Sequence, residues 1–190
     1  MTILKKWNAI YSKQENSSLT AATVLSKHTF LLPKIGVALD LACGLGANAF
    51  MLAESGLETH AWDISMVAIE KVRKLAAEKR LKVTAKQIDI QKNVLPKNSF
   101  DVIVTTRFLD RTLSHEIMAA LKFDGLLFYQ TYTQQKIADS PPHNPDFLLA
   151  ENELLSLFSP LKVIFYQEHG LIGHIEYGER NEALFIGQKT

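Results

Sequence analysis

A strand-like apolar run that ends in two glycines constrains this 190-residue chain more than any other feature. In VALDLACGLGANAF, residues 37–41 form the apolar run, which contains Asp40 and leads directly to Gly44, Gly46 and Asn48. Glycine lets a backbone turn sharply and approach a ligand, and the first N–H groups of a helix have no partner within it. The stretch therefore predicts a strand, a glycine turn and a helix N-terminus, which together build a nucleotide-type cofactor site.

Short apolar runs alternate with helical patterns along the rest of the chain. This alternation is typical of an α/β protein whose mostly parallel sheet is covered by helices on both faces. The last two strands are separated by a glycine-punctuated stretch, 170–178, that has no clear helical pattern, so we expect them to pair antiparallel. The seven predicted strands lie at residues 37–42, 58–63, 83–89, 100–106, 126–133, 162–169 and 182–189.

Helices are predicted between most of these strands. The helix after the first strand ends at Gly56, and the next one begins at the capping residue Ser65. A third helix begins near Ser114 and ends before Asp124, which precedes a glycine, and a fourth ends at Pro160.

The composition is that of an ordinary globular protein. Hydrophobic residues make up 47% of the chain and charged residues 22%, and the formal net charge of +1 gives no reason to expect binding to nucleic acid or to a membrane surface. No apolar run reaches the roughly 20 residues that span a bilayer, and the N-terminus has no secretory pattern, so we expect a cytoplasmic protein.

The length predicts a single domain over residues 1–190. Within it, residues 1–30 are expected to form an N-terminal helical cover. Residues 134–149 contain PPHNP and are expected to form a lid loop. The oligomeric state is not indicated by the sequence.

The cysteine and histidine content gives no sign of a metal or redox site. Cys43 is the only cysteine, so it cannot form a disulfide within the chain, and we expect it to be a small buried side chain. The six histidines show no spacing typical of a metal site, so no metal is predicted.

Three acidic residues mark the carboxyl ends of the first three predicted strands, where open parallel sheets bind ligands. Asp63 can accept hydrogen bonds from two ribose hydroxyls, and Asp89 can accept from an adenine amino group. Asp40 can attract an ammonium or sulfonium charge, directly or through water. These roles fit S-adenosylmethionine. A dinucleotide would place its pyrophosphate at the helix start, where Asp40 would repel it.

The stretches DLACGLGAN, AWDIS, QIDI and FDVIVTTRFLDR resemble the successive motifs of class I S-adenosylmethionine-dependent methyltransferases, and the resemblance covers most of the chain. The chain is most similar to the small bacterial group that includes tellurite-resistance and thiopurine methyltransferase-like proteins. The resemblance implies a three-layer, Rossmann-like fold with a seven-stranded, mostly parallel sheet whose last strand is antiparallel. It also implies that S-adenosylmethionine is the methyl donor and S-adenosylhomocysteine the product.

The cofactor-binding residues that this resemblance implies follow the same motifs. They are Asp40, Ala42, Gly44, Gly46, Asn48, Asp63, Ile64, Asp89 and Ile90, and Thr105 joins them at the end of the fourth strand. Ile64 and Ile90 are expected to contact the two faces of the adenine. Ala42 is a departure, because many relatives have glycine there. The added methyl would crowd the cofactor only if the backbone needs a positive φ, and we expect the alanine to be tolerated.

The methyl acceptor is expected at the carboxyl ends of the fourth and fifth strands. The candidate residues on that side are Tyr11, Thr106, Arg107, Arg111 and Tyr132. Methyl transfer is an in-line displacement, so a thiolate or another soft anion needs no general base, and an arginine can attract it. The two arginines are equally compatible with surface ion pairs. TTRF replaces the Asp/Asn-Pro-Pro-aromatic motif, which disfavours nucleobase or amide acceptors.

The sequence therefore predicts an enzyme that transfers a methyl group from S-adenosylmethionine to a small-molecule acceptor, with a soft or anionic nucleophile as the favoured class. One alternative is a methyltransferase for a macromolecule, protein or RNA. Another is a non-catalytic module that binds S-adenosylmethionine. An NAD(P)-dependent oxidoreductase is the least supported alternative, because the chain has neither a Tyr-x-x-x-Lys motif nor a substrate domain.

Overall fold

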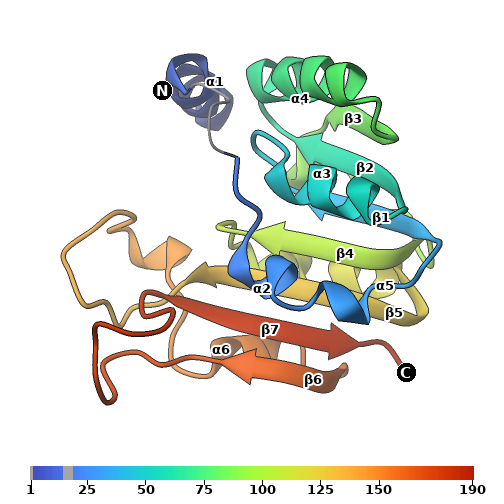
Figure 1. Ribbon diagram of the computed structural model, residues 1–190. Helices are drawn as coiled ribbons and strands as arrows, with labels where there is room; N and C mark the ends of the chain where they lie inside the picture. The colour runs from blue at the N-terminus through green and yellow to red at the C-terminus, as the bar shows by residue number, and fades with distance from the viewer. Residues whose placement is uncertain (1, 15–18) are drawn as a thin grey trace.

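A seven-stranded sheet forms the centre of the computed structural model, which describes residues 2–14 and 19–190 (Figure 1). The strand order is β3-β2-β1-β4-β5-β7-β6. Strands β1 to β5 pair in parallel, and β7 pairs antiparallel with both β5 and β6. The strands are β1 (Val37–Leu41), β2 (Glu58–Asp63), β3 (Val83–Gln87), β4 (Phe100–Thr106), β5 (Leu121–Tyr132), β6 (Lys162–Gln167) and β7 (Glu182–Gln188). The predicted fold class is confirmed.

Helices cover both faces of this sheet. In Figure 1, α2 and α3 lie in front of the strands, while α5 and α6 lie behind them. The α-helices are α1 (Ile3–Lys13), α2 (Thr23–Ser26), α3 (Ala47–Glu54), α4 (Met66–Lys79), α5 (Ser114–Ala120) and α6 (Glu153–Leu157). Short 3-10 helices cover Thr29–Leu31, Ile90–Lys92, Arg111–Leu113 and Pro145–Phe147.

The core follows from the two-residue period of the strands. Ala38 is packed in a cluster with Leu25 of α2 and Leu52 of α3, whereas its neighbour Leu39 is packed in another cluster with Ile117 of α5. All five side chains are at most 1% exposed. A central strand that is apolar on both faces is what a sheet covered by helices on both sides requires.

The predicted helix boundaries agree with the structure at two sites. Ser65 caps α4, because its hydroxyl accepts a hydrogen bond from the Ala68 N–H at 3.3 Å. Helix α3 ends at Glu54, and Gly56 follows with φ of 97°, a conformation that favours glycine.

Strand β5 starts earlier than predicted, at Leu121 rather than near residue 126. Leu121 pairs with Phe100 at the beginning of β4, and the register between the two strands then shifts. Asp124 has φ of 62° inside this segment. The residues that look like a turn in the sequence therefore form an irregularity within the strand, where one strand gains extra residues relative to its neighbour.

The N-terminal part of the chain lies against α4. Helix α1 contacts α4 (Figure 1), and the Asn8 side-chain oxygen accepts a hydrogen bond from the Ser65 hydroxyl at 2.6 Å. Part of the expected helical cover over residues 1–30, namely residues 1 and 15–18, lies outside the described residues. Within residues 2–14 and 19–190, none of the helices is long and apolar enough to cross a membrane.

Candidate functional site

The glycine turn after β1 is built from left-handed backbone conformations. Ala42, Gly44 and Gly46 have φ angles of 59°, 52° and 82°. A Cβ atom added at Gly46 would lie 2.9 Å from Cγ2 of Val72, so α3 can pack this closely on α4 only with glycine there. Ala42 adopts the positive φ that favours glycine, which costs an alanine about 1 kcal/mol. The backbone at Ala42 therefore has the positive φ at which the added methyl group was expected to crowd a cofactor.

Asp63 at the end of β2 holds the glycine turn. One carboxylate oxygen accepts from the Gly44 N–H at 2.9 Å, and the other accepts from the Ser65 N–H at 2.8 Å. The side chain is buried, and burial raises its pKa. Each carboxylate oxygen can accept a second hydrogen bond. Asp63 thus connects the turn to the start of α4 and retains capacity for a ligand.

Asp40 lies deeper than the sequence suggests. It is 1% exposed, and its Oδ2 accepts from the Ala49 N–H in α3 at 3.0 Å. Among the described residues, its Oδ1 has no hydrogen-bond partner. Burial raises the pKa of Asp40 to about 7. An unpartnered, buried carboxylate oxygen is costly, so this position favours a hydrogen-bond donor or a positive charge beside it.

Asn48 connects the glycine turn with β4 and with the N-terminal segment. Its side-chain oxygen accepts from the Ala22 N–H at 2.9 Å, and its side-chain nitrogen donates to the Thr106 hydroxyl at 3.0 Å. The residue is 6% exposed. The start of α3 is therefore adjacent to the carboxyl end of β4, where the methyl acceptor is expected.

The other residues predicted to bind the cofactor differ from one another in burial and in their partners. Asp89 follows β3 and pairs with Lys92 at 2.8 Å. Ile64 is half-buried, and Ile90 is packed in the core with 7% exposure, which is comparable to that of Asn48. Thr105 is fully buried, and its hydroxyl finds no partner within the described part of the chain.

Tyr11 of α1 reaches the glycine turn from the outside. A Cβ atom added at Gly44 would lie 2.9 Å from its hydroxyl oxygen, which shows how closely the two residues approach. Burial, followed by the charge of Asp63, raises the pKa of Tyr11. Trp7 stacks on Tyr11 with 5.5 Å between ring centroids, and Lys71 of α4 donates to the Tyr11 carbonyl at 2.6 Å. An aromatic pair therefore lies over the predicted cofactor site.

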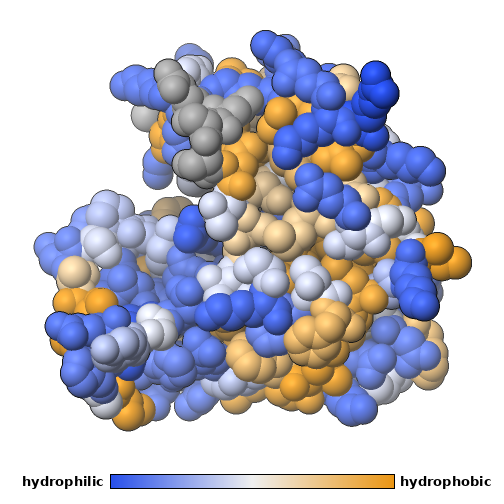
Figure 2. Space-filling view, in the orientation of Figure 1, coloured by the Kyte–Doolittle hydropathy of each residue, from blue (hydrophilic) through white to orange (hydrophobic). Residues whose placement is uncertain are grey.

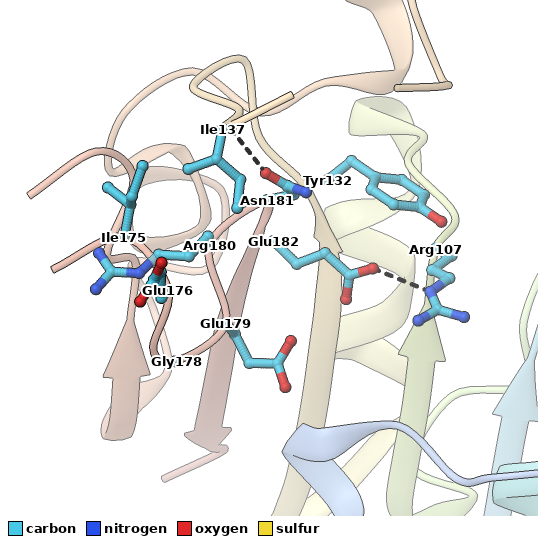
Figure 3. Close-up of a pocket in the computed structure, with 10 residues that line it drawn as sticks. All are labelled: Arg107, Tyr132, Ile137, Ile175, Glu176, Gly178, Glu179, Arg180, Asn181 and Glu182. Atoms are coloured by element: carbon cyan, nitrogen blue, oxygen red, sulfur yellow. Dashed lines mark hydrogen bonds and ion pairs between the residues drawn. The ribbon is translucent and has the colours of Figure 1, made fainter. Parts of the chain in front are cut away.

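A pocket of about 520 Å³ lies beside this site, between the ends of β4, β5 and β7 and the segment that precedes β7 (Figure 3). Arg107 and Tyr132, both predicted on the acceptor side, line it. Figure 2 shows a hollow in the surface between the α1–α4 end of the molecule and the C-terminal loops. The remaining lining residues are Ile137, Ile175, Glu176, Gly178, Glu179, Arg180, Asn181 and Glu182.

Arg107 is held at the pocket by a buried carboxylate. Its Nε donates to Glu182 at 3.0 Å, and the other oxygen of Glu182 accepts a hydrogen bond from the Gln130 side chain. Gln130 in turn accepts from the Val24 N–H at 2.8 Å. Arg107 itself has φ of 52° directly after β4. The backbone turn and the hydrogen bonds together fix its guanidinium at the rim.

Arg111 forms an ion pair, which is one of the two arrangements that the sequence left open for it. Its guanidinium binds both carboxylate oxygens of Glu153, and it also donates to the carbonyls of Asp146 at 2.8 Å and Leu148 at 3.0 Å. It does not line the pocket beside Arg107. Arg111 therefore connects the start of α6 to the end of the predicted lid loop, 134–149.

Replacing Arg111 with glutamine is expected to lower the free energy of unfolding by about 1 to 2 kcal/mol, because a bidentate ion pair and two backbone acceptors lose their donor. Urea unfolding followed by circular dichroism measures this change. Ligand affinities at the glycine turn are expected to stay unchanged. A variant with full stability and weakened ligand binding would show that Arg111 belongs to the site.

Several residues that shape the site were not found from the sequence. Glu182 and Gln130 support Arg107, and Glu179 accepts from the Thr23 hydroxyl at 2.7 Å. A signal did exist for Gln130 and Glu182, because each is a polar residue directly beside an apolar run, 126–129 and 183–186 respectively. A buried polar residue needs a partner, and this requirement points to a network.

Comparison with known proteins agrees with this architecture. Residues 38–125 match the family model described as "Methyltransferase domain". The fold is similar to that of TehB from Haemophilus influenzae, with a TM-score of 0.74 and 23% identity over 97% of this chain and 67% of that chain. It is also similar to a SAM dependent methyltransferase from Aquifex aeolicus, with a TM-score of 0.71 and 15% identity over the full length of both chains.

Among curated proteins, the chain is 30% identical to "Hemagglutinin 1" of Eikenella corrodens over 136 residues, which is 68% of this chain and 45% of that protein. This chain therefore spans less than half the length of that relative. The matched family model begins in β1 and includes the glycine turn, Asp63 and Asp89. Residues 38–125 therefore match a methyltransferase-domain model, and the whole chain has the same Rossmann-like fold as these solved methyltransferase structures.

Proposed function

We propose that this protein transfers a methyl group from S-adenosylmethionine to a small-molecule acceptor. The observation that carries the proposal is the hydrogen bond between Asn48 and Thr106, because it joins the glycine turn to the strand end that leads into the pocket. A cofactor at the turn and an acceptor in the pocket would meet at this boundary. Methyl transfer depends on such alignment of the two reactants.

The residues around the turn fit the charge and shape of S-adenosylmethionine, which supplies an electrophilic methyl group on a positively charged sulfur. The unpartnered Oδ1 of Asp40 suits a nearby positive charge, and the free acceptor capacity of Asp63 suits the ribose hydroxyls. Asp89 and Ile64 are assigned to the adenine. Ile90, which follows Asp89 in the chain, is assigned to the other face of the adenine.

Trp7 and Tyr11 are assigned to the cover of the site. Both rings lie on α1, and the Tyr11 hydroxyl already contacts the turn at Gly44. Aromatic faces attract a sulfonium charge and exclude water from the reacting atoms. The predicted lid loop, 134–149, is assigned to the opposite side, where Ile137 reaches the pocket.

The favoured acceptor is a soft or anionic nucleophile. An anion can attack the methyl carbon without first losing a proton, so no general base is required. Arg107 at the pocket rim supports this choice, because a guanidinium attracts an anion. Glu182 is poorly placed to remove a proton, because it already binds Arg107 and Gln130.

Calorimetry with S-adenosylmethionine, S-adenosylhomocysteine and NADH tests the cofactor assignment directly. Binding of the first two and not of NADH is expected. A screen of small thiols, chalcogen oxyanions, amines and carboxylates then tests the reaction, with formation of S-adenosylhomocysteine measured by mass spectrometry. Binding of NADH alone would refute the proposal, and cofactor binding without turnover of any acceptor class would favour a non-catalytic binding module.

A further inference from the structure

Arg107 and Arg180, which line the pocket, and Arg111, which does not, differ in how many of their nitrogens already donate hydrogen bonds. Arg111 donates from all three nitrogens to Glu153 and to backbone carbonyls. Arg180 donates from all three to backbone carbonyls of residues 170–177. Arg107 donates from Nε to Glu182, and no partner of its two terminal nitrogens is found in residues 2–14 and 19–190. Only Arg107 therefore has two donors left for a ligand.

The guanidinium of Arg107 is oriented by its hydrogen bond to Glu182. Glu182 is 7% exposed, and its two oxygens bind Arg107 and Gln130 (Figure 3). Burying a carboxylate costs free energy unless it is paired. Apolar residues of similar volume at both positions would usually leave the fold at least as stable. The arrangement supplies what apolar residues cannot, which is a guanidinium oriented by a hydrogen bond from its Nε while its terminal nitrogens are left for a ligand. Such a planar fork matches a carboxylate or a similar anionic group.

A second donor lies beside this guanidinium. Tyr132 projects into the same side of the pocket as Arg107 (Figure 3), and partial burial raises the pKa of its hydroxyl. A tyrosine hydroxyl is protonated at neutral pH and can donate a hydrogen bond to an anion. One charged and one neutral donor thus converge on the same part of the pocket.

The side of the pocket away from Arg107 carries two isoleucines among polar residues (Figure 3). Ile137 and Ile175 line it and are 43% and 46% exposed, although isoleucine is usually buried. Ile137 is fixed there because its N–H donates to the Asn181 side chain at 3.0 Å. Two exposed isoleucines that line the same side of a pocket offer an apolar surface to part of a ligand.

We infer that the acceptor is an amphipathic monoanion, whose anionic group binds Arg107 and Tyr132 and whose apolar body lies against Ile137 and Ile175. This inference rests on the proposed function. Glu176 and Glu179 also line the pocket, so an acceptor that carries several negative charges is disfavoured. Small inorganic oxyanions are likewise disfavoured, because they leave the isoleucines in contact with water.

The reaction balances without a base when the anionic atom is the nucleophile. A lone pair of that atom forms the new bond to the methyl carbon, and the electrons of the breaking carbon–sulfur bond stay on sulfur. The products are a neutral methylated acceptor and neutral S-adenosylhomocysteine. A thiolate yields a thioether by this step, and a carboxylate yields an ester.

Binding of three probes to the complex of the protein with S-adenosylhomocysteine tests the inference. Benzoate has both features, benzamide lacks the charge and acetate lacks the apolar body. Titration calorimetry or ligand-observed NMR is expected to give a Kd for benzoate at least tenfold lower than for benzamide and for acetate. Equal binding of benzoate and benzamide, or binding of none of the three, would overturn the inference.

Variants assign the two features to their residues. Arg107→Gln is expected to raise the Kd of benzoate at least tenfold and to leave that of benzamide unchanged. Ile175→Ala is expected to raise the Kd of benzoate about threefold and to leave that of acetate unchanged. Arg80→Gln removes the same charge from an exposed position at the end of α4 and is the matched control. Unchanged benzoate binding in Arg107→Gln would contradict the inference.

The test separates this inference from the proposed function. S-adenosylhomocysteine is titrated first, and failure of that binding would contradict the proposed function itself. Binding of S-adenosylhomocysteine together with equal affinities for the three probes would leave the methyltransferase proposal intact and remove only the amphipathic acceptor. The comparison of probes in the unmodified protein does not depend on whether any variant folds.

Discussion

Replacing Asp63 with asparagine is expected to lower the affinity for S-adenosylmethionine at least 100-fold. The carboxylate accepts from the N–H groups of Gly44 and Ser65, and under the proposed function it also accepts from the ribose hydroxyls. An asparagine retains one acceptor oxygen and turns a donating NH₂ group toward one of these N–H groups. The change therefore removes the ribose acceptor and loosens the glycine turn, and calorimetry measures the loss.

Asp101→Asn is the matched control for this variant. Asp101 also accepts from a backbone N–H, that of Val37 at 2.7 Å, and it pairs with Lys122. It lies near the start of β4, at the opposite edge of the sheet from the glycine turn. This control is expected to lose about 1 kcal/mol of stability and to keep its cofactor affinity. Asp63→Asn with unchanged affinity, in a protein that folds normally, would contradict the role assigned to Asp63.

The strand positions could be predicted because each strand is a short apolar run bounded by turn residues, and packing on both faces leaves such runs few alternatives. The antiparallel pairing of β7 was also predictable, because the sequence between β6 and β7 lacks a helical pattern. The start of β5 was not, because the glycine and aspartate that usually mark a turn lie within the strand. A strand irregularity and a turn have the same residue preferences.

The site was predictable where one stretch of chain builds it. The glycine turn and Asp63 follow directly from strand ends, so topology alone brings them together. The partners of the arginines were not predictable in this way. Glu182 lies 75 residues from Arg107 in the sequence, and Glu153 lies 42 residues from Arg111. Which arginine stays available for a ligand depends on these distant partners, and no local pattern encodes them.

The depth of Asp40 was also missed, and it carries the second large prediction. In the unfolded chain this carboxyl group has its ordinary pKa of 3.8, and burial in the folded protein raises the pKa to about 7, partly offset by the hydrogen bond from the Ala49 N–H. Between these two values the folded protein binds more protons than the unfolded chain. Stability therefore falls as the pH rises from about 4 to about 7.

Asp40→Asn is expected to remove this dependence. A difference of about three between two pKa values corresponds to about 4 kcal/mol in total, and about 2 to 3 kcal/mol of it falls between pH 5 and pH 7. The unmodified protein is thus expected to lose this much more stability than the variant across that interval. Urea unfolding of both proteins at pH 5, 6 and 7 measures the difference, and parallel pH profiles would contradict it.

The comparison must be made between the two proteins, because Asp40 is not the only buried carboxyl group at the turn. Burial also raises the pKa of Asp63, which contributes a loss in the same direction in both proteins. S-adenosylmethionine supplies a second check under the proposed function. A positive charge beside Oδ1 favours the ionised form of Asp40, so binding is expected to release a proton and to strengthen as the pH rises from 6 to 8. In Asp40→Asn the affinity is expected to be lower and nearly independent of pH, because an amide cannot acquire the charge that the cofactor stabilises.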